Sequence, residues 1–188
     1  MPPKAKISRE MVIEAGLAVV RSEGAQAISA RSVAARLGCS TQPVMYLYDT
    51  VRALKADVYA AADALHTAYL MQPDEAGGNP LLSIGLRYIR FAHEEKQLFR
   101  FLFQTDQFRS RSFRELLTAD ELAPVIEPLR AQTGLPAAQA EEVFATLFIC
   151  VHGAASLLAN NSMDFEEAYF VKLLENTLTG AVAAQKRG

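Results

Sequence analysis

The sequence predicts an all-α protein, because apolar residues recur with the helical period along almost the whole chain. No stretch alternates apolar and polar residues in the way that marks a strand or a hairpin. Apolar residues make up 51% of the 188 positions, enough for a substantial core. We expect about nine helices, arranged as an N-terminal three-helix domain followed by a C-terminal helical bundle.

The N-terminal domain begins with a helix expected from about Arg9 to Ser22, with Ser8 as its N-cap. Its apolar residues fall on one face, which predicts that this face packs inside the domain. Two short helices follow, Ala30–Leu37 and Thr41–Leu47. Gly38 lies between them and supplies the left-handed backbone that a tight turn needs.

Serines precede both short helices at capping positions. Ser29 is expected to cap the first and Ser40 the second, while Pro43 stands in the first turn of the second, where a missing N–H costs little. A longer helix is expected to start at Asp49 or Thr50 and to reach about Met71.

The C-terminal part begins after the polar connector 72–78, which is rich in glycine and charge. Asn79 followed by Pro80 is a strong helix start, and Asp164 with Glu167 resembles a capping box for the last helix. Residues 104–112 are polar and are expected to be irregular. The helices expected here are Pro80–Glu95, Lys96–Phe103, Thr118–Gln132 (with Pro124 and Pro128 bending or interrupting it), Pro136–Asn160 and a last one running to about Ala184.

Charge is divided unevenly along the chain. Residues 1–55 hold eight Lys or Arg against four Asp or Glu, so they carry +4, and the remainder carries −6. A basic head on an acidic body is typical of a phosphate-binding module joined to a domain with another task. Chance gives an equally simple account of so modest an excess.

Several classes of protein find no support in the sequence. Cys39 and Cys150 lie far apart, without a metal-ligand spacing, which argues against a disulfide framework or a zinc site. No uninterrupted apolar run has the length of a membrane span, and no apolar segment follows the basic start of the chain. We therefore expect a cytoplasmic protein that is not bound to a membrane and that uses no cofactor or metal. We also expect no catalytic residues, because no Ser/His/Asp grouping, paired carboxylates or phosphate loop can be found.

The most informative pattern is a helix, a glycine-centred turn and a second short helix, braced by the helix that precedes them. A helix-turn-helix needs these parts, because its second helix must protrude into the major groove while the first lies across the backbone. Donors to phosphate are available near helix starts at Ser8, Arg9, Ser29 and Arg31.

The same segment resembles the N-terminal domain of the TetR/AcrR family of transcriptional regulators. The resemblance rests on Glu23-Gly24, on the run from Ile28 to Ala34, on Leu37-Gly38-Cys39-Ser40, and on Leu54. It covers residues 6–66, with the helix-turn-helix at about 29–48. It implies a DNA-binding domain at 6–66 and a ligand-binding and dimerisation domain at 67–188.

The resemblance also indicates which residues meet DNA. Thr41 and Gln42 begin the recognition helix and are expected to contact base edges, with contact to phosphate or solvent alone as the alternative. Tyr46 lies outward and can donate to phosphate or stack on sugar. The full set expected at DNA is Ser29, Arg31, Ser40, Thr41, Gln42, Pro43, Tyr46 and Arg52.

Two positions depart from the family pattern. Met45 stands where a tyrosine is usual, and Val51 stands where a lysine is usual at the start of the following helix. Arg52, next to Val51, is expected to take over the phosphate contact of that lysine. Weaker binding or a shifted docking geometry would be the consequence.

The C-terminal part resembles the regulatory domains of the family more loosely, through LRYIRFAHEEKQLFRFLF and the stretch around His152-Gly153. By that resemblance an apolar inducer pocket lies among Pro80–Phe103, Thr118–Gln132 and Pro136–Asn160. A structural role in the core is the alternative for each of its candidate residues. Those candidates are Arg87, Tyr88, Phe91, Phe108, Phe148 and His152.

The last two helices are expected to form a homodimer, because they carry more apolar surface than one chain can bury. The residues expected at that surface are Val143, Leu147, Val151, Ala155 and Leu158 on one helix and Phe165, Tyr169, Leu173 and Leu178 on the other.

The function that the sequence favours is that of a DNA-binding transcriptional regulator, a repressor that a small-molecule effector releases from its double-stranded operator. The alternative is an all-α small-molecule-binding protein or enzyme in which the helix-turn-helix is merely structural. Salt-dependent binding to promoter DNA separates the two.

Overall fold

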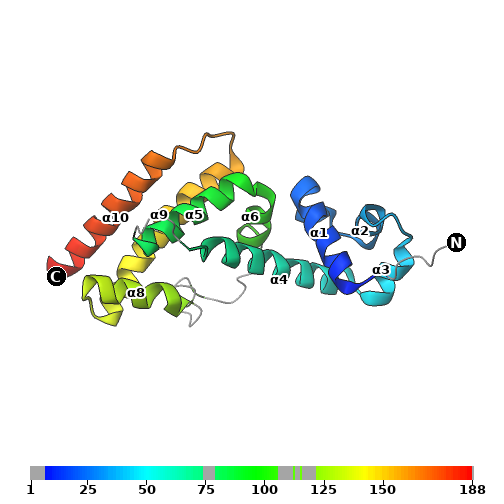
Figure 1. The fold of residues 1–188 in the computed structure, drawn as a ribbon, viewed down its shortest axis with the longest axis horizontal. Helices are drawn as coiled ribbons and strands as arrows, with labels where there is room; N and C mark the ends of the chain where they lie inside the picture. Colours follow the sequence, from blue (N-terminus) through cyan, green and yellow to red (C-terminus); the bar gives the residue numbers. More distant parts are fainter. Residues whose placement is uncertain (1–6, 74–78, 106–111, 113–114, 116–121, 188) are drawn as a thin grey trace. The chain divides into compact units, whose positions relative to one another are not determined.

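A computed structural model describes residues 7–73, 79–105, 112, 115 and 122–187. Within these residues the chain forms nine α-helices and one short 3-10 helix, with no strand, as the fold class predicted (Figure 1). The chain divides into two compact units. Unit 1 comprises residues up to Ala68 together with Glu95–Thr105, and unit 2 comprises Tyr69–Glu94 and the residues from Asp106 onward.

Unit 1 contains the three helices expected at the N-terminus. They are α1 (Arg9–Glu23), α2 (Ala30–Arg36) and α3 (Thr41–Leu47), and a 3-10 turn, η1 (Ala25–Ala27), links the first two. The core of these helices contains several branched side chains that are fully buried. Its members include Val12, Val19, Val20, Val33 and Val44.

Unit 1 is completed by most of α4 (Val51–Leu70) and by α6 (Lys96–Phe103). α6 packs against α1, and the Tyr59 hydroxyl of α4 donates to the Leu102 carbonyl of α6 over 3.2 Å. Arg21 of α1 holds Glu95 through both of its carboxylate oxygens. From the sequence we expect α6 in the C-terminal part, because this helix follows the connector 72–78. In the structure α6 packs in unit 1.

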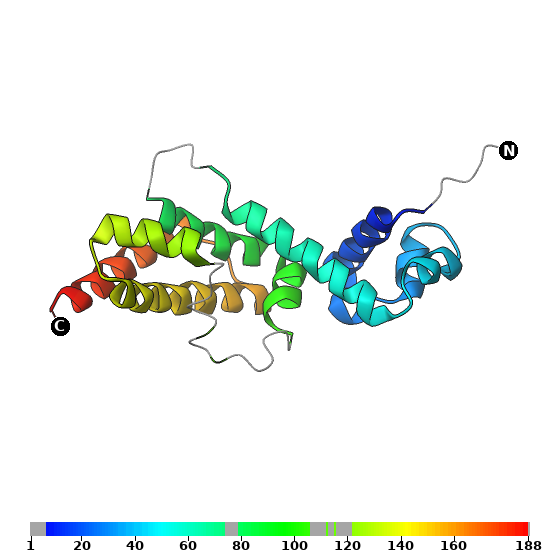
Figure 2. The same cartoon turned by 90° about the horizontal axis from the view of Figure 1, so that it is seen from below.

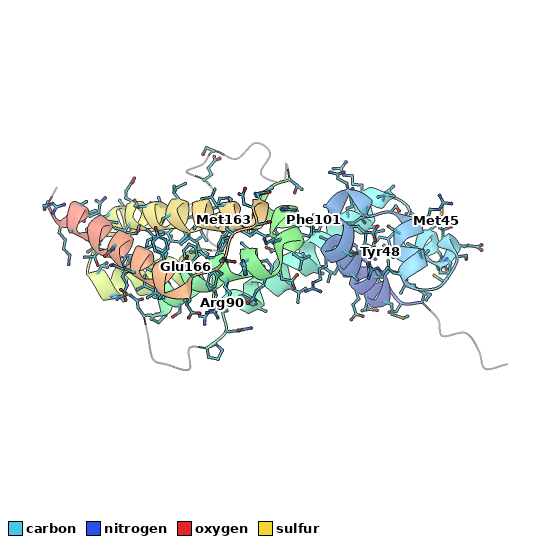
Figure 3. The ribbon with its side chains drawn as sticks, turned by 90° about the horizontal axis from the view of Figure 1, so that it is seen from above. Met45, Tyr48, Arg90, Phe101, Met163 and Glu166 are labelled. Atoms are coloured by element: carbon cyan, nitrogen blue, oxygen red, sulfur yellow. The ribbon has the colours of Figure 1, made fainter. Side chains whose placement is uncertain are left out.

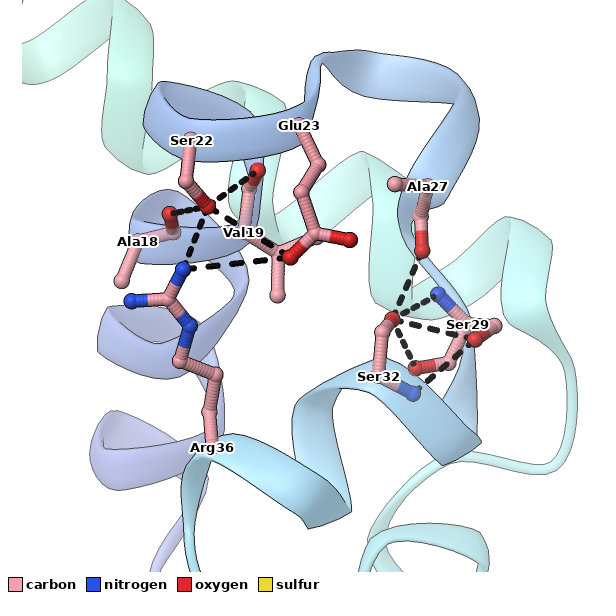
Figure 4. A network of polar contacts seen from close by, with 8 residues as sticks. All are labelled: Ala18, Val19, Ser22, Glu23, Ala27, Ser29, Ser32 and Arg36. Atoms are coloured by element: carbon pink, nitrogen blue, oxygen red, sulfur yellow. Dashed lines mark hydrogen bonds and ion pairs between the residues drawn. The ribbon is translucent and has the colours of Figure 1, made fainter.

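In unit 1, three helix caps agree with the expectation from the sequence and one does not. The Ser8 hydroxyl accepts from Met11 N, and the Thr50 hydroxyl accepts from Ala53 N. Ser29 accepts from Ser32 N while the Ser32 hydroxyl accepts from Ser29 N, which is a reciprocal capping box (Figure 4). Ser40 stands at the N-cap of α3 but makes no side-chain capping bond, so its expected role as a cap is wrong.

Unit 2 is a bundle of long helices. It contains α5 (Pro80–Glu94), α8 (Ala123–Thr133), α9 (Ala137–Asn160) and α10 (Glu167–Arg187), and α9 packs against all three others (Figure 2). Asn79 caps α5 as expected, because its Oδ1 accepts from Leu81 N. α10 begins at Glu167, which is later than the expected capping box at Asp164 requires, and Glu167 instead pairs with Arg90 over 2.6 Å.

The long helix α9 also has the length and composition of a membrane span, with a mean hydropathy of 1.7 over an 18-residue window. Of that window, 39% is buried inside the protein. Its contacts with α5, α8 and α10 mark it as the core helix of unit 2, which accounts for its apolar character.

Candidate functional site

The turn between α2 and α3 sets the direction of α3. Gly38 has a φ of 63°, in the left-handed region that a residue with a Cβ adopts at a cost. The Cys39 amide donates to the Ala34 carbonyl over 3.0 Å and closes the turn. α3 therefore leaves α2 abruptly, as the second helix of a helix-turn-helix must.

α3 is held by its buried side. Val44 and Tyr48 face the interior, and the Tyr48 hydroxyl donates to Asp57 of α4 over 2.8 Å. Arg9 of α1 donates to the same Asp57 oxygen over 2.8 Å, and its guanidinium lies 4.8 Å from the centre of the Tyr48 ring. These two donors lower the pKa of Asp57, Arg9 first, so the carboxylate stays charged.

This contact changes the interpretation of Arg9, which the sequence suggested as a donor to phosphate. Its Nε is engaged by Asp57, so Arg9 links α1 to α4. No local pattern reveals this link, because Arg9 and Asp57 lie 48 residues apart in the chain.

The outer side of α3 presents polar and aromatic side chains. Thr41, Gln42 and Tyr46 are exposed, and Tyr46, at 87%, is the most exposed large hydrophobic side chain among the described residues. Pro43 in the first turn is half-buried, and Ser40 is exposed just before it. So much exposed side-chain surface on a seven-residue helix indicates that this side of α3 binds a partner and does not pack in the core.

Two arginines beside α3 are exposed and, among the described residues, make no ion pair: Arg31 in the first turn of α2 and Arg52 in the first turn of α4. Arg36 differs from them, because its guanidinium reaches Glu23 at 3.8 Å and also the Ser22 hydroxyl (Figure 4). Ser29 is half-buried and its hydroxyl belongs to the capping box, so this side chain has a structural role as the N-cap of α2.

The candidate ligand residues divide into two groups. Tyr88 of α5 meets Phe148 and His152 of α9: the Tyr88 hydroxyl and His152 Nδ1 are 2.9 Å apart, and the Phe148 and His152 rings stack at 5.5 Å. Burial raises the pKa of Tyr88 and lowers that of His152, so a neutral hydroxyl and a neutral imidazole share this hydrogen bond.

Arg87 and Phe91 lie on another side of α5. Arg87 Nε donates to the Leu70 carbonyl at the end of α4 over 2.9 Å, and the Phe91 ring meets Tyr69 edge to face at 5.4 Å. Phe108 lies outside the described residues. Of the five candidates that the structure describes, Tyr88, Phe148 and His152 lie together. Among the described residues, no group of His, Cys, Asp or Glu side chains is arranged to hold a metal.

The residues expected at a dimer surface are mostly buried within the chain, which overturns the stated basis of that prediction. Val143, Leu147 and Val151 of α9 face the core of unit 2, because the stripe that the sequence singled out is the inward one. The large apolar side chains that α9 does expose are Ile149 at 53% and Leu157 at 57%. Because α9 has apolar residues on both sides, the helical period alone does not show which side faces outward.

Comparisons with known proteins agree with this architecture. Residues 81–180 match the family model described as the tetracyclin repressor-like C-terminal domain, which is more than half of the chain. The chain belongs to this TetR family of transcription regulators.

A solved structure of a TetR variant from Acinetobacter baumannii AYE in complex with minocycline superposes with a TM-score of 0.57 at 17% identity. The match covers 97% of this chain and 98% of that one. At this identity the likeness shows a shared fold. Among curated proteins, none matches this sequence.

Proposed function

We propose that the protein is a cytoplasmic, dimeric repressor that binds an operator in double-stranded DNA and is released by a small-molecule ligand. Residues 6–66 bind DNA in this proposal, and 67–188 bind the ligand and the second subunit. The protein has no catalytic role, metal or cofactor.

The observation that carries the proposal is the uncovered face of α3. Thr41 and Gln42 at its start, and Tyr46 one turn later, are all exposed on the second helix of a helix-turn-helix. Glutamine pairs well with the edge of adenine, and threonine can donate to a base or touch a thymine methyl. Tyr46 reaches phosphate or sugar.

Arg31 and Arg52 supply the contacts to phosphate. Arg31 lies in the first turn of α2 and Arg52 in the first turn of α4, the helices before and after α3 in the chain, and both side chains are exposed. Such contacts fix the register of the protein on the duplex without reading its sequence. Ser29, Ser40 and Pro43 lie at the edges of the same surface.

The dimer forms through the outward faces of α9 and α10. Ile149 and Leu157 are exposed on α9, Tyr169 is exposed on α10, and Gly153 lies between the two α9 residues with open space in front of it. A glycine in the middle of a helix costs stability, which close approach of a second helix to this exposed face would offset. Two-fold symmetry then places two copies of α3 for successive major grooves, about 34–36 Å apart.

The ligand site is built around Tyr88, Phe148 and His152. Two rings, a hydroxyl and a neutral imidazole suit a largely apolar, uncharged molecule with one hydrogen-bonding group. Minocycline, which the similar TetR structure contains, is an example of a ligand in this fold. The ligand weakens operator binding only by as much as it binds the released state more tightly.

The test uses the full chain and the tightest duplex selected from a random pool. Gln42→Ala is expected to weaken binding to that duplex by about 1–3 kcal/mol while leaving binding to random duplex almost unchanged. Gln72→Ala, the same change at an exposed position outside α3, is the matched control. Failure of the chain to bind any duplex in a salt-dependent manner would contradict the proposal.

A further inference from the structure

A small apolar hollow lies directly beside the exposed face of α3. It has a volume of about 110 Å³ and lies where α3, the start of α4 and the first residue of α2 meet. Its lining consists of Ala30, Val44, Met45, Tyr48, Asp49, Thr50, Val51 and Leu54. Two residues of this lining, Met45 and Tyr48, are labelled in Figure 3.

Two of the apolar residues in this lining are exposed to solvent. Met45 is 61% exposed and Val51 is 43% exposed, although both lie on the proposed DNA-binding surface. In the described part of unit 1 the other large apolar side chains in this state are Tyr46, next to Met45, and Leu65, far along α4. The exposed apolar surface of unit 1 is therefore concentrated around one end of α3, which marks an interaction site.

The chemistry of the lining argues against phosphate as the occupant. The hollow contains no Lys or Arg, and its one ionised side chain is the carboxylate of Asp49. A phosphate oxygen placed there would meet a negative charge and alkyl groups. An apolar group without charge suits the same walls.

We propose that this hollow receives the C5-methyl group of a thymine in the operator, so that Met45 and Val51 determine specificity by apolar contact. Met45 follows Thr41 by one helical turn, on the same strip of α3, so a base edge read by Thr41 brings its neighbour towards Met45. The thymine methyl is the one apolar group that the major groove offers. A volume of about 110 Å³ is ample for a methyl group and its flanking atoms. This inference rests on the proposed function.

The test replaces thymidine by deoxyuridine, one position at a time, in the selected duplex bound by the full chain. This change removes the methyl group and leaves every hydrogen-bonding group of the base in place. At one position of each half-site, affinity is expected to fall about fourfold, which corresponds to roughly 0.8 kcal/mol for one buried methyl group. Other positions are expected to change less.

Met45→Ala then identifies the contact. In this variant the fourfold loss at the sensitive position is expected to disappear, because the wall that the methyl group contacts is gone. Met45 is exposed, so its removal leaves the fold intact. Met163→Ala makes the same change at an exposed methionine outside the hollow and is expected to retain the loss in full.

Val51→Lys provides an independent readout. A lysine here is expected to add about one unit to the slope of log K against log[salt] while reducing the discrimination between thymidine and deoxyuridine. A duplex that binds well but tolerates deoxyuridine everywhere, or a loss that persists in Met45→Ala, would overturn the inference and leave the proposed function standing. Absence of any DNA binding would instead contradict the proposed function itself.

Discussion

The helices inside unit 1 and the helices inside unit 2 are joined by different kinds of contact. In unit 1 polar contacts of fixed geometry tie helices that are distant in sequence, as Asp57 joins Arg9 to Tyr48 and as Glu95 joins Arg21. In unit 2 the long helices meet mainly through apolar and aromatic faces, with α9 against α5, α8 and α10.

Under the proposed function this difference would suit the different tasks of the two units. Hydrogen bonds and ion pairs depend steeply on distance and angle, so they hold α3 in one orientation, which a reader of bases needs. Apolar contacts are non-directional, so helices packed through them can shift slightly at small cost, which a ligand-responsive domain needs. The predictions below test this contrast.

The largest effect is expected at the exposed face of unit 2. Leu157→Glu combined with Ile149→Glu is expected to convert the dimer into a monomer, because four apolar side chains of the symmetric interface would become charged. Because each of these side chains is already about half covered within the chain, their burial in the interface contributes about 3–6 kcal/mol, or roughly two to four orders of magnitude in Kd. Light scattering at micromolar concentration measures the change.

The control for this experiment is Met71→Glu, which places the same charge at an exposed apolar residue outside α9 and α10. This variant is expected to remain a dimer. A wild-type chain that is already monomeric at micromolar concentration would show that the exposed stripe serves another purpose.

The second effect concerns a buried imidazole in unit 1. His66 packs edge to face on Phe103 at 5.1 Å, and burial lowers its pKa to about 4. Between pH 6.5 and pH 4 the unfolded chain therefore binds more protons than the folded one, so stability falls as the pH falls. Between pH 7.5 and pH 5 the loss from this group is about 2 kcal/mol.

The measurement is denaturant unfolding of the full chain, followed by circular dichroism at the two pH values. His66→Phe retains an aromatic ring without a titrating group and is expected to lose about 2 kcal/mol less on acidification than the wild type does. An equal loss in both proteins would assign the acid sensitivity to carboxylates alone.

A smaller effect tests how tightly unit 1 is packed. Gly16 of α1 is buried against α4, where an added Cβ would overlap Cγ2 of Val58. Gly16→Ala is therefore expected to destabilise the protein by roughly 1 kcal/mol, although alanine is the better helix former. In a Val58→Ala background the same change is expected to stabilise it. A stabilising effect in both backgrounds would show that α1 and α4 are not in close contact.

The smallest effect is expected at a phosphate contact. Arg31→Ala is expected to reduce the slope of log K against log[salt] by about one unit, equally for selected and random duplexes. Arg36→Ala, which removes an arginine already paired with Glu23, is expected to change the slope less. A slope unchanged by Arg31→Ala would place its guanidinium away from DNA.

Much of the helix-turn-helix could be predicted because its signals are local. Ser8, Ser29 and Gly38 act within a few residues of their own positions, so caps and the turn follow from the order of residues. The exposed side of a short amphipathic helix is local information too, and Gln42 and Tyr46 lie where the period places them.

The candidate ligand site could be predicted only in part. The aromatic character of α5 and α9 is visible in the sequence, but Tyr88 meets His152 only because two helices 64 residues apart pack side by side. Arg87 and Phe91, one turn apart on α5, meet the end of α4 instead. The helical period cannot tell which of two neighbouring helices an apolar face will meet.

What the sequence determined by itself was the all-helical class, the bounds of most helices and the turn that projects α3, since these depend on backbone preferences and caps within one or two turns. Tertiary structure alone decided three further features: the place of α6 in unit 1, the link from Arg9 to Asp57, and the outward direction of Ile149 and Leu157. Each depends on side chains far apart in the chain, and their meeting is fixed by the packing of the whole unit.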